Sequence, residues 1–187
     1  MEPIIVTAPE HKYFPPKSMK VFLAGGICQC IEWQKRVIDY FQEDKEFLEL
    51  NVTYDQLYLL NPRRAEWLEK EGEAIRQIEW EFDMLERCDL FSMYFAGGES
   101  VQPICMYELG RYIERMKQRF PNTWKARIVI TCDSSYKRLA DVLVQTRLAT
   151  NGEVTVNVID GDEESVIFHY SQISYQLKNI YDESELF

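Results

Sequence analysis

Short apolar runs alternate with segments of helical periodicity along most of this chain. Residues 90–95, Leu-Phe-Ser-Met-Tyr-Phe, are apolar almost throughout and are followed closely by Gly97 and Gly98. Strands of parallel sheets show this pattern because helices cover both of their faces. We expect five strands of this kind, at residues 21–25, 57–60, 90–95, 126–131 and 154–159.

The segments between these runs repeat apolar residues at three- and four-residue steps, which is the spacing of one helix face. In residues 73–87, this spacing predicts a buried stripe of Ile75, Ile78, Phe82 and Leu85. Pro103 suits the first turn of a later helix, where its missing N–H is no loss. We expect helices over residues 32–44, 73–87, 103 to about 121, 136–149 and 163–180.

This alternation is typical of a mainly parallel sheet with helices on both faces. Five strands favour a flavodoxin-like, doubly wound α/β fold, with the last strand antiparallel or at an edge. Residues 1–18 contain four prolines and no core pattern, so we expect an extended N-terminal arm. Residues 19–187 then form a single α/β domain, since the length is too short for two ordinary ones.

The chain is acidic, with 31 Asp and Glu residues against 21 Lys and Arg residues and a net charge of −10. Such a surface repels polyphosphate, so we expect no nucleic acid polymer as a partner. No segment approaches the roughly 18 consecutive apolar residues of a membrane helix, and no basic leader is present. We therefore expect a soluble, cytoplasmic protein without a membrane partner.

The sequence contains no pattern that points to a metal or a cofactor. Cys28 and Cys30 lack a second cysteine pair, and His11 and His169 are far apart in the chain. Neither a Gly-x-Gly-x-x-Gly nor a Gly-Lys-Ser/Thr motif occurs, so we expect no dinucleotide cofactor and no phosphoryl transfer. Two remote histidines and no Gly-x-Ser-x-Gly motif argue against a Ser-His or Cys-His triad, which leaves carboxylate chemistry.

Ligands of doubly wound sheets bind beyond the carboxyl ends of the strands. This rule gathers residues 25–27, 61–64, 97–108 and 131–135 on one rim. Within them Glu108 lies outside the apolar helix face of Met106, Leu109, Ile113 and Met116. It is either a solvated surface charge or a carboxylate held near the helix start and aimed at a ligand.

Other carboxylates could act with Glu108. Glu81 flanks the apolar stripe of the helix at residues 73–87, and Asp89 precedes the strand at residues 90–95. Two carboxylates about 5 Å apart suit retaining cleavage of a glycosidic bond, because one attacks the anomeric carbon and the other handles the proton of the leaving group. Trp80 is available to flank a flat base, or belongs to the core.

Several motifs resemble nucleoside 2-deoxyribosyltransferase-like proteins in their order and spacing. They extend from residue 21 to about residue 131 and include Val-Phe-Leu-Ala-Gly-Gly at 21–26, Asn-Pro-Arg-Arg at 61–64, Gln-Ile-Glu-Trp-Glu at 77–81 and Gln-Pro-Ile-Cys-Met-Tyr-Glu-Leu-Gly at 102–110. The resemblance implies that Glu108 is the nucleophile that takes the deoxyribosyl group, and that Glu81 contacts and protonates the base. It also implies a homo-oligomer with sites at subunit interfaces.

The chain departs from this family at Gln102, where members with transferase activity usually carry an aspartate. A glutamine can hydrogen-bond a sugar hydroxyl or a base edge, but it cannot shuttle a proton. Asn61, Arg63 and Arg64 either orient sugar hydroxyls or a phosphate, or form a turn with solvated arginines. The expected substrate-binding set is completed by Gly25, Gly26, Ile27 and Trp80.

Three functions follow from these residues. The leading hypothesis is an enzyme that cleaves the N-glycosidic bond of a nucleoside and passes 2-deoxyribose to another base. The second keeps the site but uses water as the acceptor, which makes the protein a nucleoside or nucleotide N-hydrolase. The third is a non-catalytic module that binds a nucleotide-like ligand or a protein partner.

Overall fold

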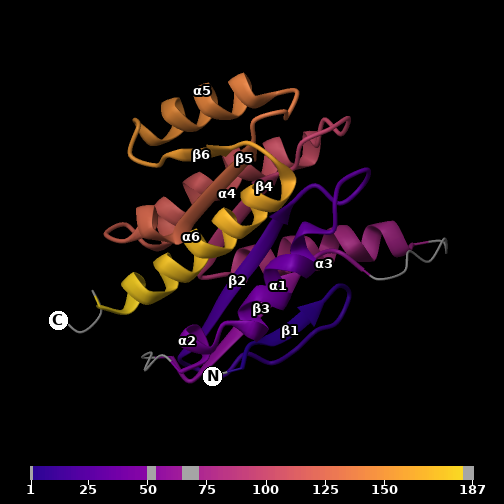
Figure 1. The fold of residues 1–187 in the computed structure, drawn as a ribbon. Helices are drawn as coiled ribbons and strands as arrows, with labels where there is room; N and C mark the ends of the chain where they lie inside the picture. Colours follow the sequence, from indigo (N-terminus) through magenta and orange to yellow (C-terminus); the bar gives the residue numbers. More distant parts are fainter. Residues whose placement is uncertain (1, 50–53, 65–71, 183–187) are drawn as a thin grey trace.

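A six-stranded parallel sheet forms the centre of the protein, which is shown in Figure 1 as a computed structural model describing residues 2–49, 54–64 and 72–182. The strand order is β1-β3-β2-β4-β5-β6, and every neighbouring pair is parallel. This arrangement confirms the predicted flavodoxin-like α/β fold. The strands are β1 (Ile4–Thr7), β2 (Ser18–Gly25), β3 (Gln56–Asn61), β4 (Leu90–Phe95), β5 (Ile128–Asp133) and β6 (Val156–Ile159).

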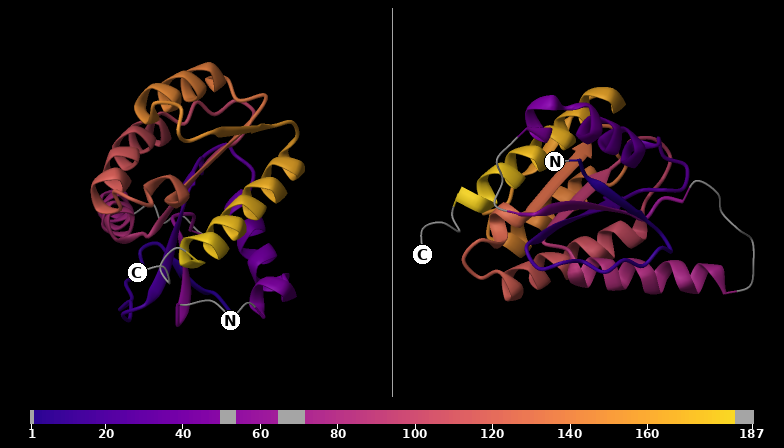
Figure 2. Two further views of the ribbon diagram at one scale, coloured as in Figure 1. Left: turned by 90° about the vertical axis from the view of Figure 1, so that its left-hand side faces the viewer. Right: turned by 90° about the horizontal axis from the view of Figure 1, so that it is seen from below.

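Helices cover both faces of the sheet. On one face α1 (Trp33–Glu43), α2 (Lys45–Leu48) and α6 (Asp162–Asp182) close one hydrophobic core. On the other, α3 (Glu73–Arg87), α4 (Pro103–Arg119) and α5 (Leu139–Thr150), with the short 3-10 helix η1 (Trp124–Arg127), close a second core. Figure 2 shows α4 and α6 on opposite sides of the sheet. Among the described residues, no helix combines the length and the apolar character needed to cross a membrane.

Strand β4 lies in the middle of the sheet, and all six of its side chains are buried. Successive residues of a strand face opposite sides. Phe91 and Met93 accordingly pack under α3 and α4, while Leu90 and Tyr94 pack under α1 and α6. Burial on both faces explains why this run is apolar without alternation, as the sequence predicts.

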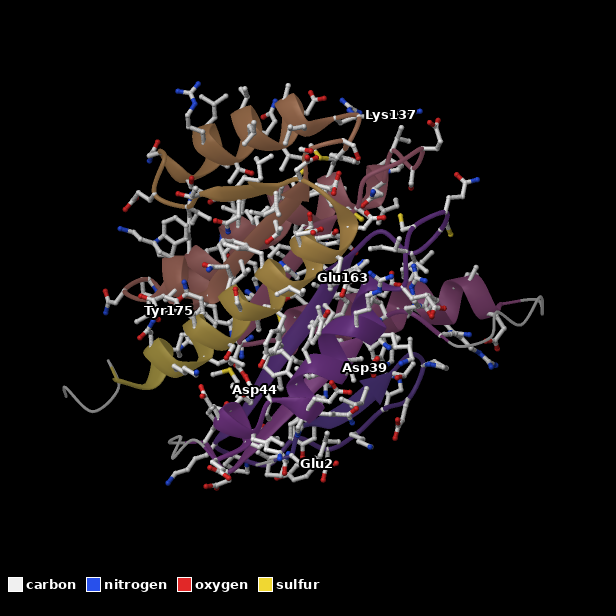
Figure 3. The ribbon with its side chains drawn as sticks, viewed as in Figure 1. Glu2, Asp39, Asp44, Lys137, Glu163 and Tyr175 are labelled. Carbon is white, nitrogen blue, oxygen red and sulfur yellow. The ribbon has the colours of Figure 1, made fainter. Side chains whose placement is uncertain are left out.

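Polar contacts between α1 and α6 stabilise the packing of these two helices on one face of the sheet. Glu163 of α6 accepts hydrogen bonds from Arg36 Nη1 (2.6 Å) and from the Tyr40 hydroxyl (2.7 Å) of α1. The Tyr170 hydroxyl of α6 donates to Asp44, which follows α1. Figure 3 labels Glu163 and Asp44 along this seam, which lies on the opposite side of the sheet from α3 and α4.

The ends of the sheet differ from the expectation in two ways. Residues 4–7 are not part of an extended arm, because they form β1 and pair in parallel with β3, with Val6 fully buried. Their Ile-Ile-Val-Thr sequence favours a strand, but the prolines around it obscure the signal. At the other end β6 is an edge strand, as one alternative predicted, and it is parallel rather than antiparallel.

The buried face of α3 also differs from the predicted stripe. Ile75, Ile78 and Phe82 are 62%, 64% and 47% exposed, while Trp80 and Met84 are buried against the sheet. Apolar spacing identifies a stripe on a helix, but the rotation of the helix about its axis depends on what it packs against. The face of α3 that carries the large Trp80 side chain packs against the sheet, so the stripe of Ile75, Ile78 and Phe82 remains on the surface.

Candidate active site

A cavity of about 400 Å³ opens at the carboxyl ends of β2 and β4, on the side covered by α3 and α4. Its wall is formed by the loop 25–29 after β2, by Pro62 after β3, and by residues 99–105 at the start of α4. Three carboxylates line it, those of Glu81, Glu99 and Glu108. Three of the four predicted rim segments therefore contribute residues to one cavity, with Pro62 alone from residues 61–64, whereas the segment 131–135 lies outside it.

Glu108 projects into this cavity from the second turn of α4. An adjacent face of the helix places Leu109, Ile113 and Met116 in the core, as predicted. Burial and, to a smaller extent, the charge of Glu81 raise the pKa of Glu108 to about 8. A carboxyl group in such surroundings keeps its proton at much higher pH than a surface glutamate does.

Glu81 reaches the same cavity from α3. Its Oε1 accepts a hydrogen bond of 2.6 Å from Gln77 Nε2. Burial raises the pKa of Glu81, while the Gln77 bond and the positive charge of Arg64 act in the opposite direction. Two interacting carboxyl groups with raised pKa values titrate as a pair, and such a pair suits proton transfer.

Two glycines bring the loop after β2 close to its neighbours. At Gly25, with φ of +151°, an added Cβ would lie 2.3 Å from the carbonyl oxygen of Tyr94. At Gly26 an added Cβ would lie 2.6 Å from Gln102 Oε1 and 2.5 Å from Cys30 Sγ. A larger residue at Gly25 would push the end of β2 away from β4, and one at Gly26 would push the loop away from Gln102 at the start of α4, so either would change the shape of the cavity wall.

Gln102 caps the start of α4 in a left-handed conformation, with φ of 43°. Its side chain lines the cavity but is only 5% exposed, and its Nε2 donates to the carbonyl oxygen of Ala96 at 2.9 Å. Within the described residues Oε1 has no hydrogen-bond donor. A buried acceptor left without a donor is costly, so a ligand hydroxyl or N–H at this place would be bound favourably.

The two arginines predicted to bind substrate do not line the cavity, but they contact segments that form its wall. Arg63 Nη2 donates to the carbonyl oxygens of Ile27 (2.7 Å), Cys30 (3.3 Å) and Ile31 (3.0 Å), which fixes the loop after β2. Arg64 donates to Gln77 Oε1 at 2.6 Å and pairs with Glu73 at 2.7 Å. Asn61 Oδ1 accepts from the backbone N–H of Arg63, so it supports the turn. Pro62, between them, is the member of this segment that lines the cavity.

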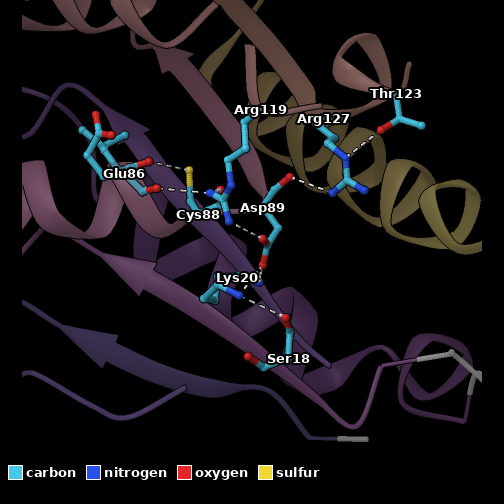
Figure 4. Close-up of polar contacts among 9 residues, drawn as sticks. Ser18, Lys20, Glu86, Cys88, Asp89, Arg119, Thr123 and Arg127 are labelled. Atoms are coloured by element: carbon cyan, nitrogen blue, oxygen red, sulfur yellow. Dashed lines mark hydrogen bonds and ion pairs between the residues drawn. The ribbon is translucent and has the colours of Figure 1, made fainter. Parts of the chain in front are cut away.

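Trp80 and Asp89 are not brought to the cavity. Trp80 is 1% exposed, packs on Phe22 and donates its indole N–H to the carbonyl oxygen of Glu10. Asp89 lies beside the amino end of β4, where it pairs with Lys20 (2.5 Å) and Arg119 (3.1 Å), as Figure 4 shows. The cavity is at the carboxyl end of the same strand, so the ion pairs of Asp89 belong to the packing of β2, β4 and α4.

Some cavity residues were missed in the sequence. Cys105 is buried in the wall, three residues before Glu108, and Ser100 and Glu99 precede the helix. The helical spacing of Cys105 and Glu108 could have revealed that they share a face. The carboxylate of Glu99 is mostly exposed and pairs with Lys137, so burial does not distinguish it from other surface glutamates.

Comparison with known protein families supports the predicted resemblance. A sequence model described as nucleoside 2-deoxyribosyltransferase like matches residues 18–120, which are more than half of the chain. The matched segment runs from β2 through α4 and includes every residue that lines the cavity. A search of curated proteins gave no match. By its fold and by this match, the chain belongs to the nucleoside 2-deoxyribosyltransferase-like family.

Proposed function

We propose that the protein cleaves the N-glycosidic bond of a nucleoside and transfers the 2-deoxyribosyl group to another base. The observation that carries this proposal is that Glu81 and Glu108, from two different helices, line one cavity at the rim where parallel sheets bind ligands. Family membership supports glycosyl transfer on nucleosides in general. The nucleophile, the acid and the acceptor are the specific parts of the proposal.

In the first half of the reaction Glu108 passes its proton to Glu81, and the carboxylate of Glu108 attacks C1′ of the sugar. The bond between C1′ and the base nitrogen breaks, and its electron pair stays on the base. The base takes up the proton of the carboxyl pair through Glu81 and leaves as a neutral molecule. The product is an ester between the sugar and Glu108, which is the covalent intermediate of a retaining mechanism.

In the second half an acceptor base replaces the first one. Its nitrogen attacks C1′, the ester bond breaks, and the carboxylate of Glu108 is released. Glu81 takes the proton that the acceptor loses, so the pair again holds one proton and one negative charge. The raised pKa of each group suits this cycle, because a pair of ordinary surface glutamates would hold no proton near neutral pH.

The alternative acceptor is water, which would make the protein an N-hydrolase. The observation that favours it is Gln102, which occupies the position where active transferases of the family usually carry an aspartate. Its unpaired Oε1 in the cavity wall can accept a hydrogen bond from a sugar hydroxyl or from a water molecule. A hydrolase would release free sugar at the same rate with and without an added base.

The proposal includes a homo-oligomer. Next to the cavity, α3 and α4 expose apolar side chains that a second copy of the chain would cover. The five with the largest exposure on these helices are Ile75, Ile78, Phe82, Ile104 and Tyr107. Ile104 also lines the cavity, so a second copy seated here would complete its wall.

A chromatographic screen for released base tests this function. Purified protein is incubated with 2′-deoxynucleosides, ribonucleosides and their 5′-monophosphates, with and without a second free base. We expect a new nucleoside to form only when the second base is present. Glu108→Gln should lower the rate roughly a thousandfold or more. Glu114→Gln, on the exposed side of the same helix, is the control. Undiminished turnover of Glu108→Gln would exclude the covalent mechanism.

A further inference from the structure

Gln77 hydrogen-bonds one member of the carboxyl pair, and both the nitrogen and the oxygen of its amide have partners. It lies on α3, one turn before Glu81, and is only 6% exposed. Its Nε2 donates to the carbonyl oxygen of Pro62 at 2.7 Å and to Glu81 Oε1 at 2.6 Å. Its Oε1 accepts from Arg64 Nε at 2.6 Å.

These partners permit only one orientation of the amide. If the amide were turned over, its oxygen would face two acceptors, the Pro62 carbonyl and the Glu81 carboxylate. Its NH₂ group would at the same time face the guanidinium of Arg64, which has no acceptor. The direction of the Gln77 amide therefore follows from its surroundings.

The arginine that orients Gln77 is itself fixed. Arg64 Nη1 pairs with Glu73 Oε2 at 2.7 Å, and both side chains are about nine-tenths buried. Glu73 pairs on its other oxygen with Arg76 at 3.0 Å. The contacts thus run from Glu73 through Arg64 and Gln77 to Glu81. A chain of charged and amide groups in a buried place holds its members in one arrangement.

The hydrogen bond from Gln77 favours the ionised form of Glu81, because an N–H group stabilises a carboxylate more than a carboxylic acid. It also occupies Oε1, so a proton on Glu81 is carried by Oε2. Glu108 receives no such bond from Gln77. When the pair carries one proton and one charge, the charge therefore resides on Glu81 and the proton on Glu108.

We propose that Gln77 is a positioning residue that keeps the Glu81–Glu108 pair in its singly protonated state, and that Arg64 holds Gln77 in the orientation this requires. The consequence for catalysis rests on the function proposed above, whereas the effect on Glu81 does not. Loss of the Gln77 amide would let the pair take a second proton at higher pH. With two protons on the pair, Glu108 has no carboxylate to which it can pass its proton, so its own carboxylate cannot form and attack the sugar.

Carbon-13 NMR of protein labelled at the glutamate carboxyl carbons measures this effect without a substrate. The Glu81 and Glu108 signals are assigned from their loss in Glu81→Gln and Glu108→Gln. In Gln77→Leu we expect the titration midpoint of Glu81 to rise by about one pH unit, since a hydrogen bond to a charged group is lost. An unchanged or lower midpoint would overturn the proposal.

Gln77→Glu is the second variant, for the case in which Gln77→Leu does not fold. It keeps the size of the side chain and the acceptor for Arg64, but it removes the N–H donor and adds a like charge, so the Glu81 midpoint should rise as well. Gln34→Leu is the matched control, because Gln34 is fully buried on α1 and its amide makes no hydrogen bond within the described residues. In Gln34→Leu the titration midpoint of Glu81 should equal that of the wild type.

Activity then separates the two proposals. If the wild type releases base, Gln77→Leu should move the acid limb of its kcat/KM profile to higher pH by the amount that NMR records. A merely structural defect would lower activity at every pH and leave the limb in place. If the Glu81 midpoint shifts but no nucleoside yields free base, the role of Gln77 stands and the proposed function fails.

Discussion

Glu81 on α3 and Glu108 on α4 line the same cavity, and the charge of Glu81 adds to burial in raising the pKa of Glu108 to about 8. Within the part of the chain that the structure describes, no ion pair with a basic side chain is found for either carboxyl group, and the bond to Glu81 comes from the neutral amide of Gln77. The pair is therefore suited to holding a proton near neutral pH, which a salt-bridged pair would not be.

The first prediction concerns the alkaline limb of activity. Above about pH 8 Glu108 loses the last proton of the pair, so no proton is available for the leaving base. We expect kcat/KM for base release to fall as pH rises through about 8. The measurement is a pH series of initial rates by chromatography. A profile that stays level across this range would show that the reaction does not use the proton of the pair.

The second prediction concerns stability. In the folded protein the pKa of Glu108 lies near 8, above its unfolded value of about 4.3, so the folded state binds the proton more tightly. This contribution is fully present below about pH 4 and is lost as pH rises through about 8. A glutamine does not titrate. The stability of Glu108→Gln relative to wild type should therefore rise from acid to alkaline pH by several kcal/mol, since each pKa unit corresponds to about 1.4 kcal/mol.

Urea unfolding of both proteins at about pH 5 and about pH 8 measures this difference. Glu114→Gln again serves as the control, because Glu114 is 58% exposed. Its stability relative to wild type should be the same at both pH values. If Glu108→Gln behaves like this control, Glu108 is hydrated in the folded protein and titrates like a surface glutamate.

The third prediction separates the two roles open to Asp89. Its carboxylate pairs with Lys20 and Arg119, and the Lys20 and Asp89 side chains are only 13% and 14% exposed. Asp89→Asn would leave Lys20 charged and largely buried without its partner, so we expect a loss of about 2 kcal/mol in urea unfolding. Base release per folded molecule should be unchanged. A large fall in kcat at unchanged stability would instead restore the catalytic role inferred from the sequence.

Sequence patterns predicted the central part of the fold well. Strands β2 to β5 and helices α1, α3 and α4 appear close to their predicted bounds, because each is a long or strongly apolar segment with clear ends. The four-residue strand β1 was missed, since prolines surround it and it is too short to show a period. Its place in the sheet comes from pairing with β3, which no local pattern encodes.

The site was predictable in part. Glu108, Glu81, Gly25, Gly26, Ile27 and Gln102 all line the cavity, because chain order and the strand-end rule suffice to bring them together. Arg63 and Arg64 lie behind the wall instead, since their guanidinium groups are taken by loop carbonyls and by Gln77 and Glu73. The sequence shows a charge at these positions, but it does not show which acceptors lie within reach.

The rotation of α3 was the least predictable feature, and it leads to the fourth prediction. Ile78 is 64% exposed on the outer stripe of α3, which belongs to the apolar surface that a second copy would cover in the proposed contact. If a second copy covers this surface, Ile78→Asp would bury a charge in the contact, which is strongly unfavourable. We expect the wild type to be oligomeric and Ile78→Asp to be monomeric by size-exclusion chromatography with light scattering.

Leu148→Asp is the matched control for this surface. Leu148 is 60% exposed, close to the value for Ile78, but it lies on α5, which packs beside β6 at the far edge of the sheet. Leu148→Asp should keep the oligomeric state of the wild type. Because the proposed contact also completes the cavity wall at Ile104, Ile78→Asp should raise KM for the nucleoside. An oligomer that survives Ile78→Asp and dissociates with Leu148→Asp would place the interface at the α5 edge and leave the cavity of each copy open.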